Sequence, residues 1–251
     1  MNVDTRPSEF ESSKGVWTLV GPLGLLLTAV GTTGLLVLLG LLGLSPSPLT
    51  WYLARASGLT LYLLLWLALV SGLGLTTKLL DLLGGRRVVW DLHRLATELA
   101  YSLLALHLLA LAVDPSVPLG IAGVLLPFMS GVRQPWTDLG ILAAYGFLAV
   151  AASFSLRRFI GMAAWRALHY ATFPLWAIAS LHGIGAGSDA TRPWAILLYT
   201  TTTGVVVFLM SARLFQAMRF RQQWSGESRL DVGLAAPGGG SSNERNARPR
   251  G

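Results

Sequence analysis

The sequence predicts an all-α, polytopic membrane protein built as a bundle of six transmembrane helices, and three observations support this prediction. Hydrophobic residues make up 53% of the chain and charged residues only 12%, whereas charged residues make up about 25% of soluble domains. Long apolar runs can each cross a bilayer as a helix of about 20 residues. Short segments rich in charge, proline or glycine separate these runs, and the extended polar stretch comes only at the C-terminus. The six predicted spans are residues 17–43, 50–76, 88–113, 137–156, 163–186 and 194–212.

The segments outside the spans are short and polar or are broken by proline. Residues 1–15 carry both acidic and basic side chains, unlike the basic start of a signal peptide. Residues 114–136 contain several prolines and too short an apolar core to span, so we expect an interfacial or re-entrant cap there. Residues 218–251 form a tail that we expect to be mostly disordered, from about residue 225 onward. The helical domain is therefore predicted to occupy residues 16–217.

The distribution of basic residues predicts the orientation of the bundle. Six spans leave both termini on one side, which carries 16 Lys and Arg residues, whereas the opposite side carries three. The positive-inside rule therefore places both termini in the cytoplasm, with the protein in the inner (plasma) membrane. This asymmetry also explains the net charge of +7 and the pI near 10.4 without nucleic acid as a partner.

The four histidines of the chain all lie in two predicted spans, with His93 and His107 in the third and His169 and His182 in the fifth. An ionisable side chain inside a bilayer costs a few kcal/mol unless it has a partner or a function. Fourteen residues separate the first two histidines, about 21 Å of helix rise and about 40° short of whole turns, so they share a face. Thirteen residues separate the other two, and Pro174 between them predicts a kink that changes their relative orientation.

Depth in the membrane pairs the histidines across the two helices. His93 and His169 lie four or five residues into their spans, and His107 and His182 lie about eighteen residues in. Two parallel helices would hold these pairs about 20 Å apart, which suits two stacked haems with two axial histidines each and is too far for one zinc site. The chain has no cysteine, so thiolate-ligated haem, iron–sulfur clusters and covalent c-type haem are excluded. The predicted cofactors are two b-type haems.

Two arginines are candidate partners for the haem propionates. Arg55 is expected to serve the external haem and Arg94, next to His93, the cytoplasmic one, because guanidinium groups bind carboxylates in a forked geometry. The alternative is that both side chains extend toward the membrane surface. Glu98 lies about 180° around the third helix from His107, and the sequence shows no partner for it.

These residues resemble the ferric reductase-like transmembrane domain, the six-helix haem-binding module of NADPH oxidases, ferric reductases and the membrane haem subunit of the bacterial methionine sulfoxide reductase system. The resemblance covers residues 17–215 and is closest to stand-alone bacterial members. It implies a six-helix haem-binding bundle with axial histidines on the third and fifth helices. The features that carry it are His93-x13-His107, His169-x12-His182 and the segments 51–58, 125–136 and 165–183.

One departure from that family bears on the electron donor. NADPH oxidases and ferric reductases continue into a cytoplasmic flavin and nicotinamide domain, whereas about 35 residues follow the last predicted span here. The run GGG at 238–240 lacks the strand and helix of a dinucleotide-binding motif. We therefore expect electrons to come from a flavoprotein reductase or a quinol.

Three functions are compatible with the sequence. The first is an oxidoreductase component that carries electrons from a cytoplasmic flavoprotein or quinol to an external redox partner or acceptor. The second is a cytochrome b-type, quinol-linked subunit of a larger complex, because respiratory cytochrome b also pairs histidines on two helices. The third is a membrane scaffold with structural histidines. None of them requires a catalytic side chain that the sequence identifies.

Overall fold

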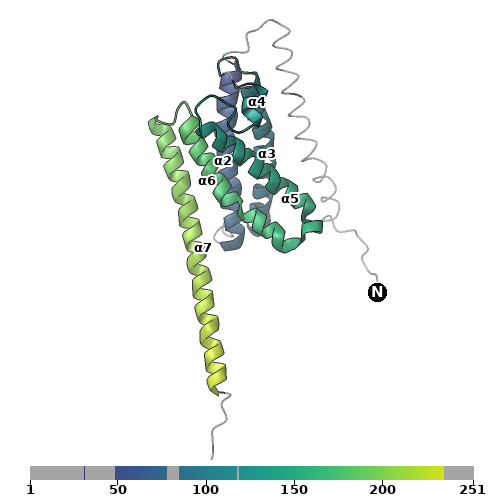
Figure 1. Cartoon of the computed structure of the whole chain (residues 1–251). Helices are drawn as coiled ribbons and strands as arrows, with labels where there is room; N and C mark the ends of the chain where they lie inside the picture. The colour runs from purple at the N-terminus through teal and green to yellow at the C-terminus, as the bar shows by residue number, and fades with distance from the viewer. Residues whose placement is uncertain (1–30, 32–48, 78–84, 118, 235–251) are drawn as a thin grey trace, which may run out of the picture. The chain divides into compact units, whose positions relative to one another are not determined.

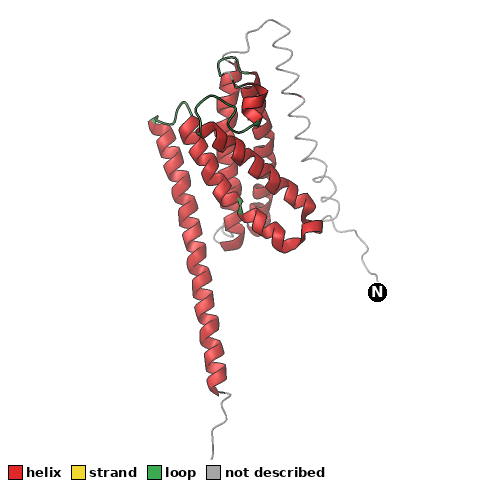
Figure 2. Cartoon of the chain, in the orientation of Figure 1, coloured by secondary structure: helices red, strands yellow, loops and turns green. Residues whose placement is uncertain are grey.

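The computed structural model describes residues 31, 49–77, 85–117 and 119–234, with side chains described as far as residue 219. The regular secondary structure in these residues is entirely helical (Figures 1 and 2), which confirms the predicted all-α class for the part described. The helices are α2 (Leu49–Thr77), α3 (Gly85–Val113), α4 (Gly120–Leu125), α5 (Trp136–Tyr170), α6 (Thr172–Ala186) and α7 (Pro193–Leu234).

Four helical segments are long and apolar enough to cross a membrane, so the chain is a membrane protein. Their most apolar windows have mean hydropathies between 1.7 and 2.0, and they cover five of the six predicted spans. The predicted first span, the N-terminal tail and residues 235–251 lie outside the described residues. Large apolar side chains such as Leu197 and Phe208 are more than 60% exposed, as expected for surfaces that face lipid. The four segments are Leu49–Thr76, Gly85–Val113, Trp136–Ala186 and Pro193–Arg219.

The third of these segments folds back on itself at Gly161. This residue has a φ of 82° and a ψ of 160°, a left-handed conformation that glycine adopts without a steric penalty. After this turn, α6 packs antiparallel to α5, because Gly140 faces His182 and Gly146 faces Leu175. The segment therefore consists of two antiparallel helical stretches, which correspond to the predicted fourth and fifth spans.

The predicted interruption near Pro174 is also present. Helix α5 ends at Tyr170 and α6 begins at Thr172, with Ala171 between them. Pro174 lacks the N–H that would bond to the carbonyl of Tyr170, and a proline is tolerated in the first turn of a new helix. The interruption lies between His169 and α6, within the stretch that separates His169 from His182.

The connection between α3 and α5 contains α4 and turns, and its described residues include no helix long enough to span. Hydrogen bonds fasten it to the first turns of α5. The backbone N–H of Phe128 donates to the buried Asp138 carboxylate at 2.7 Å, and the Tyr145 hydroxyl donates to the carbonyl of Leu125 at 2.7 Å. The segment predicted as a cap is thus held against one end of α5.

The described chain divides into two compact units inside α7. The first unit ends at Leu209 and the second begins at Met210. Helix α7 continues to Leu234, past residue 225, from which the sequence predicts disorder. A helix that has already formed extends without a further nucleation cost, which explains how a polar sequence can continue it.

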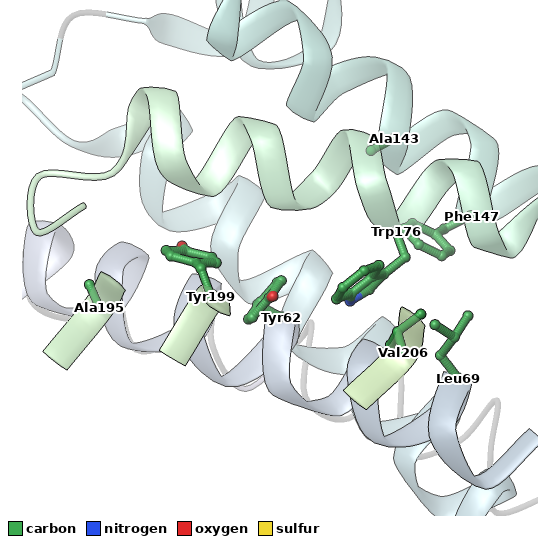
Figure 3. Close-up of a cluster of buried hydrophobic side chains, with 8 residues drawn as sticks. All are labelled: Tyr62, Leu69, Ala143, Phe147, Trp176, Ala195, Tyr199 and Val206. Atoms are coloured by element: carbon green, nitrogen blue, oxygen red, sulfur yellow. The ribbon is translucent and has the colours of Figure 1, made fainter. Parts of the chain in front are cut away.

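The core of the first unit is an aromatic and aliphatic cluster between α2, α5, α6 and α7 (Figure 3). Tyr62 stacks on Trp176 with ring centroids 6.0 Å apart and meets Tyr199 edge-on at 4.9 Å. Its hydroxyl lies 2.6 Å from the Thr202 hydroxyl, which itself donates to the carbonyl of Leu198. Tyr62 is therefore the donor to Thr202. The cluster comprises Tyr62, Leu69, Ala143, Phe147, Trp176, Ala195, Tyr199 and Val206.

Removing the Tyr62 hydroxyl should measurably destabilise the bundle. We expect Tyr62→Phe to lower the free energy of unfolding by about 1 kcal/mol, because a buried interhelical hydrogen bond is lost. Tyr52→Phe is the matched control, since Tyr52 is 56% exposed. Unfolding in mixed micelles with increasing dodecyl sulfate measures both changes. Equal stability of the two variants would contradict the structural role of this bond.

Candidate functional site

His93 and His169, the 93/169 pair, face each other across α3 and the last turn of α5. Their ring centroids are 6.2 Å apart, with an angle of 72° between the ring planes. An imidazole–metal bond is about 2.0–2.1 Å long, so two rings bound to one ion from opposite sides have centroids about 6 Å apart. The separation of this pair therefore matches that of two axial ligands on one metal.

His107 and His182, the 107/182 pair, line one cavity of about 370 Å³ in the first unit. Most of the other lining side chains are apolar, among them Leu104 and Phe147. The ligand sites of proteins are typically cavities of this kind, apolar with a few convergent polar groups.

The two pairs lie at different levels of the bundle. His93 and His107 are fourteen residues apart on the uninterrupted helix α3, which corresponds to about 21 Å. The structure thus brings together the same histidines that their depths paired in the sequence. Two separate sites, one above the other, follow from this arrangement.

Three of the four histidines are fixed by a hydrogen bond from Nδ1 to a backbone carbonyl. The acceptors are Ala68 for His93 at 2.8 Å, Ala54 for His107 at 2.7 Å, and Trp136 for His182 at 2.9 Å. A carbonyl can only accept, so Nδ1 carries the hydrogen and Nε2 keeps its lone pair. Histidines that bind metals are typically held in this way by their second ring nitrogen.

Glycines make room for the same three rings. Gly58 faces His107, Gly72 faces His93 and Gly140 faces His182. A Cβ on these glycines would lie 2.9, 3.3 and 2.5 Å, respectively, from the nearest atom of the facing imidazole. Each ring therefore occupies the space that a side chain would otherwise fill.

His169 is held differently. It stacks on Trp165 with centroids 5.2 Å apart and 21° between the planes, and its ring makes no hydrogen bond within the described residues. The 93/169 pair thus combines one ring anchored to a carbonyl with one ring anchored by stacking.

Arg55 lies on the wall of the cavity and forms an ion pair with Asp189. Its guanidinium also lies 5.0 Å from the ring centre of Trp51. The sequence predicted that Arg55 would need an anion or would extend to the membrane surface, and Asp189 supplies the anion. Asp189 was missed because a single aspartate in a connection between helices carries no recognisable pattern.

Arg94 and Glu98 form an ion pair one turn apart on α3, with Nε and Oε1 separated by 2.9 Å. Arg94 is thus the partner of Glu98 that was not evident from the sequence.

The anchors of the histidines were also missed, although the sequence contains a signal for two of them. The pattern Ala-x-x-Ser-Gly occurs at 54–58 and again at 68–72. The two copies are fourteen residues apart, the same spacing as that between His93 and His107.

Each pair offers two imidazole nitrogens, the donor atoms that a haem iron takes from a protein. Among the residues that the structure describes, no three His, Asp or Glu side chains converge as in a protein-only metal site. Haem iron needs only one or two axial ligands from the protein, because the macrocycle supplies the others. Comparisons with family models, curated proteins and solved structures find no match to this chain.

The Arg55–Asp189 pair should stabilise the bundle more than the Arg94–Glu98 pair. The Asp189 side chain is 15% exposed, whereas that of Glu98 is 29% exposed and follows its partner on the same helix. We expect Asp189→Asn to lower the free energy of unfolding by about 1–2 kcal/mol and Glu98→Gln by less than about 0.5 kcal/mol. Unfolding in mixed micelles measures both, and the reverse order would contradict the assignment.

Proposed function

We propose that this chain is a transmembrane electron-transfer protein that binds two b-type haems, one at the 93/169 pair and one at the 107/182 pair. The observation that supports this function is the pair of bis-histidine sites about 21 Å apart on α3. A histidine with only a structural role would need neither a second histidine facing it nor a second histidine pair elsewhere along the helix. We also propose that the chain is a ferric reductase-like transmembrane protein, on the histidine spacing given above.

The side chains around each pair would hold and tune the cofactor. Haem supplies one-electron redox chemistry when it is bound. The histidines would provide the axial nitrogens, and the carbonyls of Ala54, Ala68 and Trp136 keep three of the rings in the Nδ1–H form. Apolar lining residues exclude water, which together with axial ligation sets the reduction potential.

Electrons are proposed to move from the cytoplasmic side to the external side, one at a time. A reduced flavin or a quinol in the cytoplasmic half loses one electron in each step and releases its proton on that side. An external acceptor gains that electron. The positive-inside rule supports the orientation in this proposal, with the 93/169 pair toward the cytoplasm, and the proposed location is the plasma membrane.

The arginines are proposed to bind haem propionates, Arg55 at the 107/182 pair and Arg94 at the 93/169 pair. Arg55 lines the cavity together with His107 and His182, which supports its role. Its pairing with Asp189 implies that a propionate shares the guanidinium or displaces the carboxylate.

Substitution of single histidines should remove single haems. We expect about two haems per purified chain and about one after His107→Ala or His182→Ala, because each haem loses an axial ligand. Haem content by pyridine haemochrome assay and reduced-minus-oxidised spectra measure this, with Tyr52→Phe as a control. An unmodified chain that binds no haem would instead support a scaffold with structural histidines.

The identity of the donor can be tested in proteoliposomes that enclose an oxidant. We expect a quinol or an enzymatically reduced flavin to reduce the haem and the enclosed oxidant, and NADPH alone to reduce neither. Reduction by quinol but not by flavin would favour the cytochrome b-type subunit. Rapid reduction by NADPH without a flavoprotein would contradict the proposed donor.

A further inference from the structure

The three anchored histidines share one backbone device. In each case the accepting carbonyl belongs to residue i of a neighbouring helix, and the glycine that faces the ring is residue i+4 of the same helix. Residue i+4 is the residue whose N–H bonds to that carbonyl in a helix. A glycine there lets a second donor, the imidazole N–H, approach the carbonyl from the side. The three combinations are Ala54 with Gly58, Ala68 with Gly72, and Trp136 with Gly140.

Helix α2 carries this device twice with the same spacing as the histidines on α3. The two glycines, the two serines and the two accepting alanines are each fourteen residues apart. Ser57 donates to the carbonyl of Ala54 at 3.1 Å, and Ser71 donates to that of Ala68 at 3.0 Å. Because α2 and α3 run antiparallel, a single register of the two helices lets His107 bond to Ala54 and His93 bond to Ala68.

Helix α5 carries the device once, at the 107/182 pair. A repeat after fourteen residues, as on α2, would place the accepting carbonyl at Val150. The facing glycine would then be at position 154, where the chain has Phe154. The hydroxyl of Ser153 still donates to the carbonyl of Val150, at 2.6 Å. Phe154 instead meets Trp165 edge-on at 6.3 Å, and Trp165 stacks on His169. A phenylalanine thus occupies the sequence position at which a fourth such arrangement would need a glycine.

We propose that Gly58, Gly72 and Gly140 are positioning residues for the axial histidines and that they make the two sites unequal. This inference rests on the proposed function. The 107/182 pair has two carbonyl-anchored rings, whereas the 93/169 pair has one. A hydrogen bond from Nδ1–H makes an imidazole a stronger donor to its metal, which favours the oxidised iron. The haem at the 107/182 pair therefore has the lower midpoint potential.

This difference has a consequence for electron flow. An electron that enters from the cytoplasmic side resides mainly on the haem of the 93/169 pair, because that haem has the higher potential. It moves to the 107/182 pair when an external acceptor withdraws it. With one electron in the chain, the externally facing haem is mostly oxidised, and the uphill transfer to it is driven by the acceptor that removes the electron.

The test compares alanine substitutions at the three glycines in the full chain, with redox titration and low-temperature electron paramagnetic resonance of the oxidised haems. Gly204→Ala is the matched control, since a Cβ there has no atom within 4 Å. We expect Gly58→Ala and Gly140→Ala to shift the lower of the two midpoint potentials to more positive values and to change its resonance signal. Gly72→Ala should shift the higher potential, and Gly204→Ala should shift neither.

The outcomes separate this inference from the proposed function. If the chain binds two haems and all three variants titrate like Gly204→Ala, the inference is wrong and the proposed function stands. A shift of the higher potential by Gly58→Ala would overturn the order of the sites. If Gly140→Ala fails to accumulate, Gly58→Ala decides the same site with a smaller clash, at 2.9 Å.

A cofactor-free measurement tests the anchoring itself. In the chain without haem and labelled with ¹⁵N-histidine, we expect nitrogen chemical shifts of the Nδ1–H form for three of the four imidazoles. His169→Asn should remove the one signal that lacks this form, and His107→Asn should remove one that has it. Rapid tautomer averaging of all four rings would overturn the positioning role.

Discussion

An imidazole N–H inside a bilayer is costly unless it is hydrogen-bonded, and three of the four histidines satisfy it with a backbone carbonyl of a neighbouring helix. No water is available there, and an unpaired polar group costs several kcal/mol. Most carbonyls of a helix already accept from residue i+4, and a glycine at that position leaves room for an imidazole to share the carbonyl. Gly58, Gly72 and Gly140 provide this room. In the antiparallel register of α2 against α3, His107 and His93 use the first two of these glycines at the same time.

Three further side chains of the core form hydrogen bonds between helices. Tyr62 donates to Thr202, the Trp66 indole donates to the carbonyl of the same threonine at 3.1 Å, and Tyr101 donates to the carbonyl of Phe147 at 2.9 Å. These bonds join α2 to α7 and α3 to α5 without exposing a polar group to hydrocarbon. Aromatic contacts of Tyr62 with Trp176 and Tyr199 join α2 to α6 and α7 in the same core (Figure 3).

Each histidine pair offers two imidazoles, but the contacts that hold the rings differ between the two pairs. At the 107/182 pair, rings from α3 and α6 both reach carbonyls across a glycine. At the 93/169 pair, His93 reaches a carbonyl across a glycine, whereas His169 stacks on Trp165. Local helix geometry thus turns two chemically equivalent pairs into two different environments.

The sequence by itself determined the helical class, the apolar spans that lie within the described residues and the pairing of histidines by depth. These features are local, because a helix rises by a fixed amount per residue and an apolar run of sufficient length needs no other segment to define it. Pro174 likewise indicated the interruption before α6 through its missing N–H. Only the tertiary structure decided that Asp189 pairs with Arg55 and that Gly161 turns the chain. It also decided which carbonyl holds each ring, because contacts between helices depend on register and packing, which the periodicity of one helix does not determine.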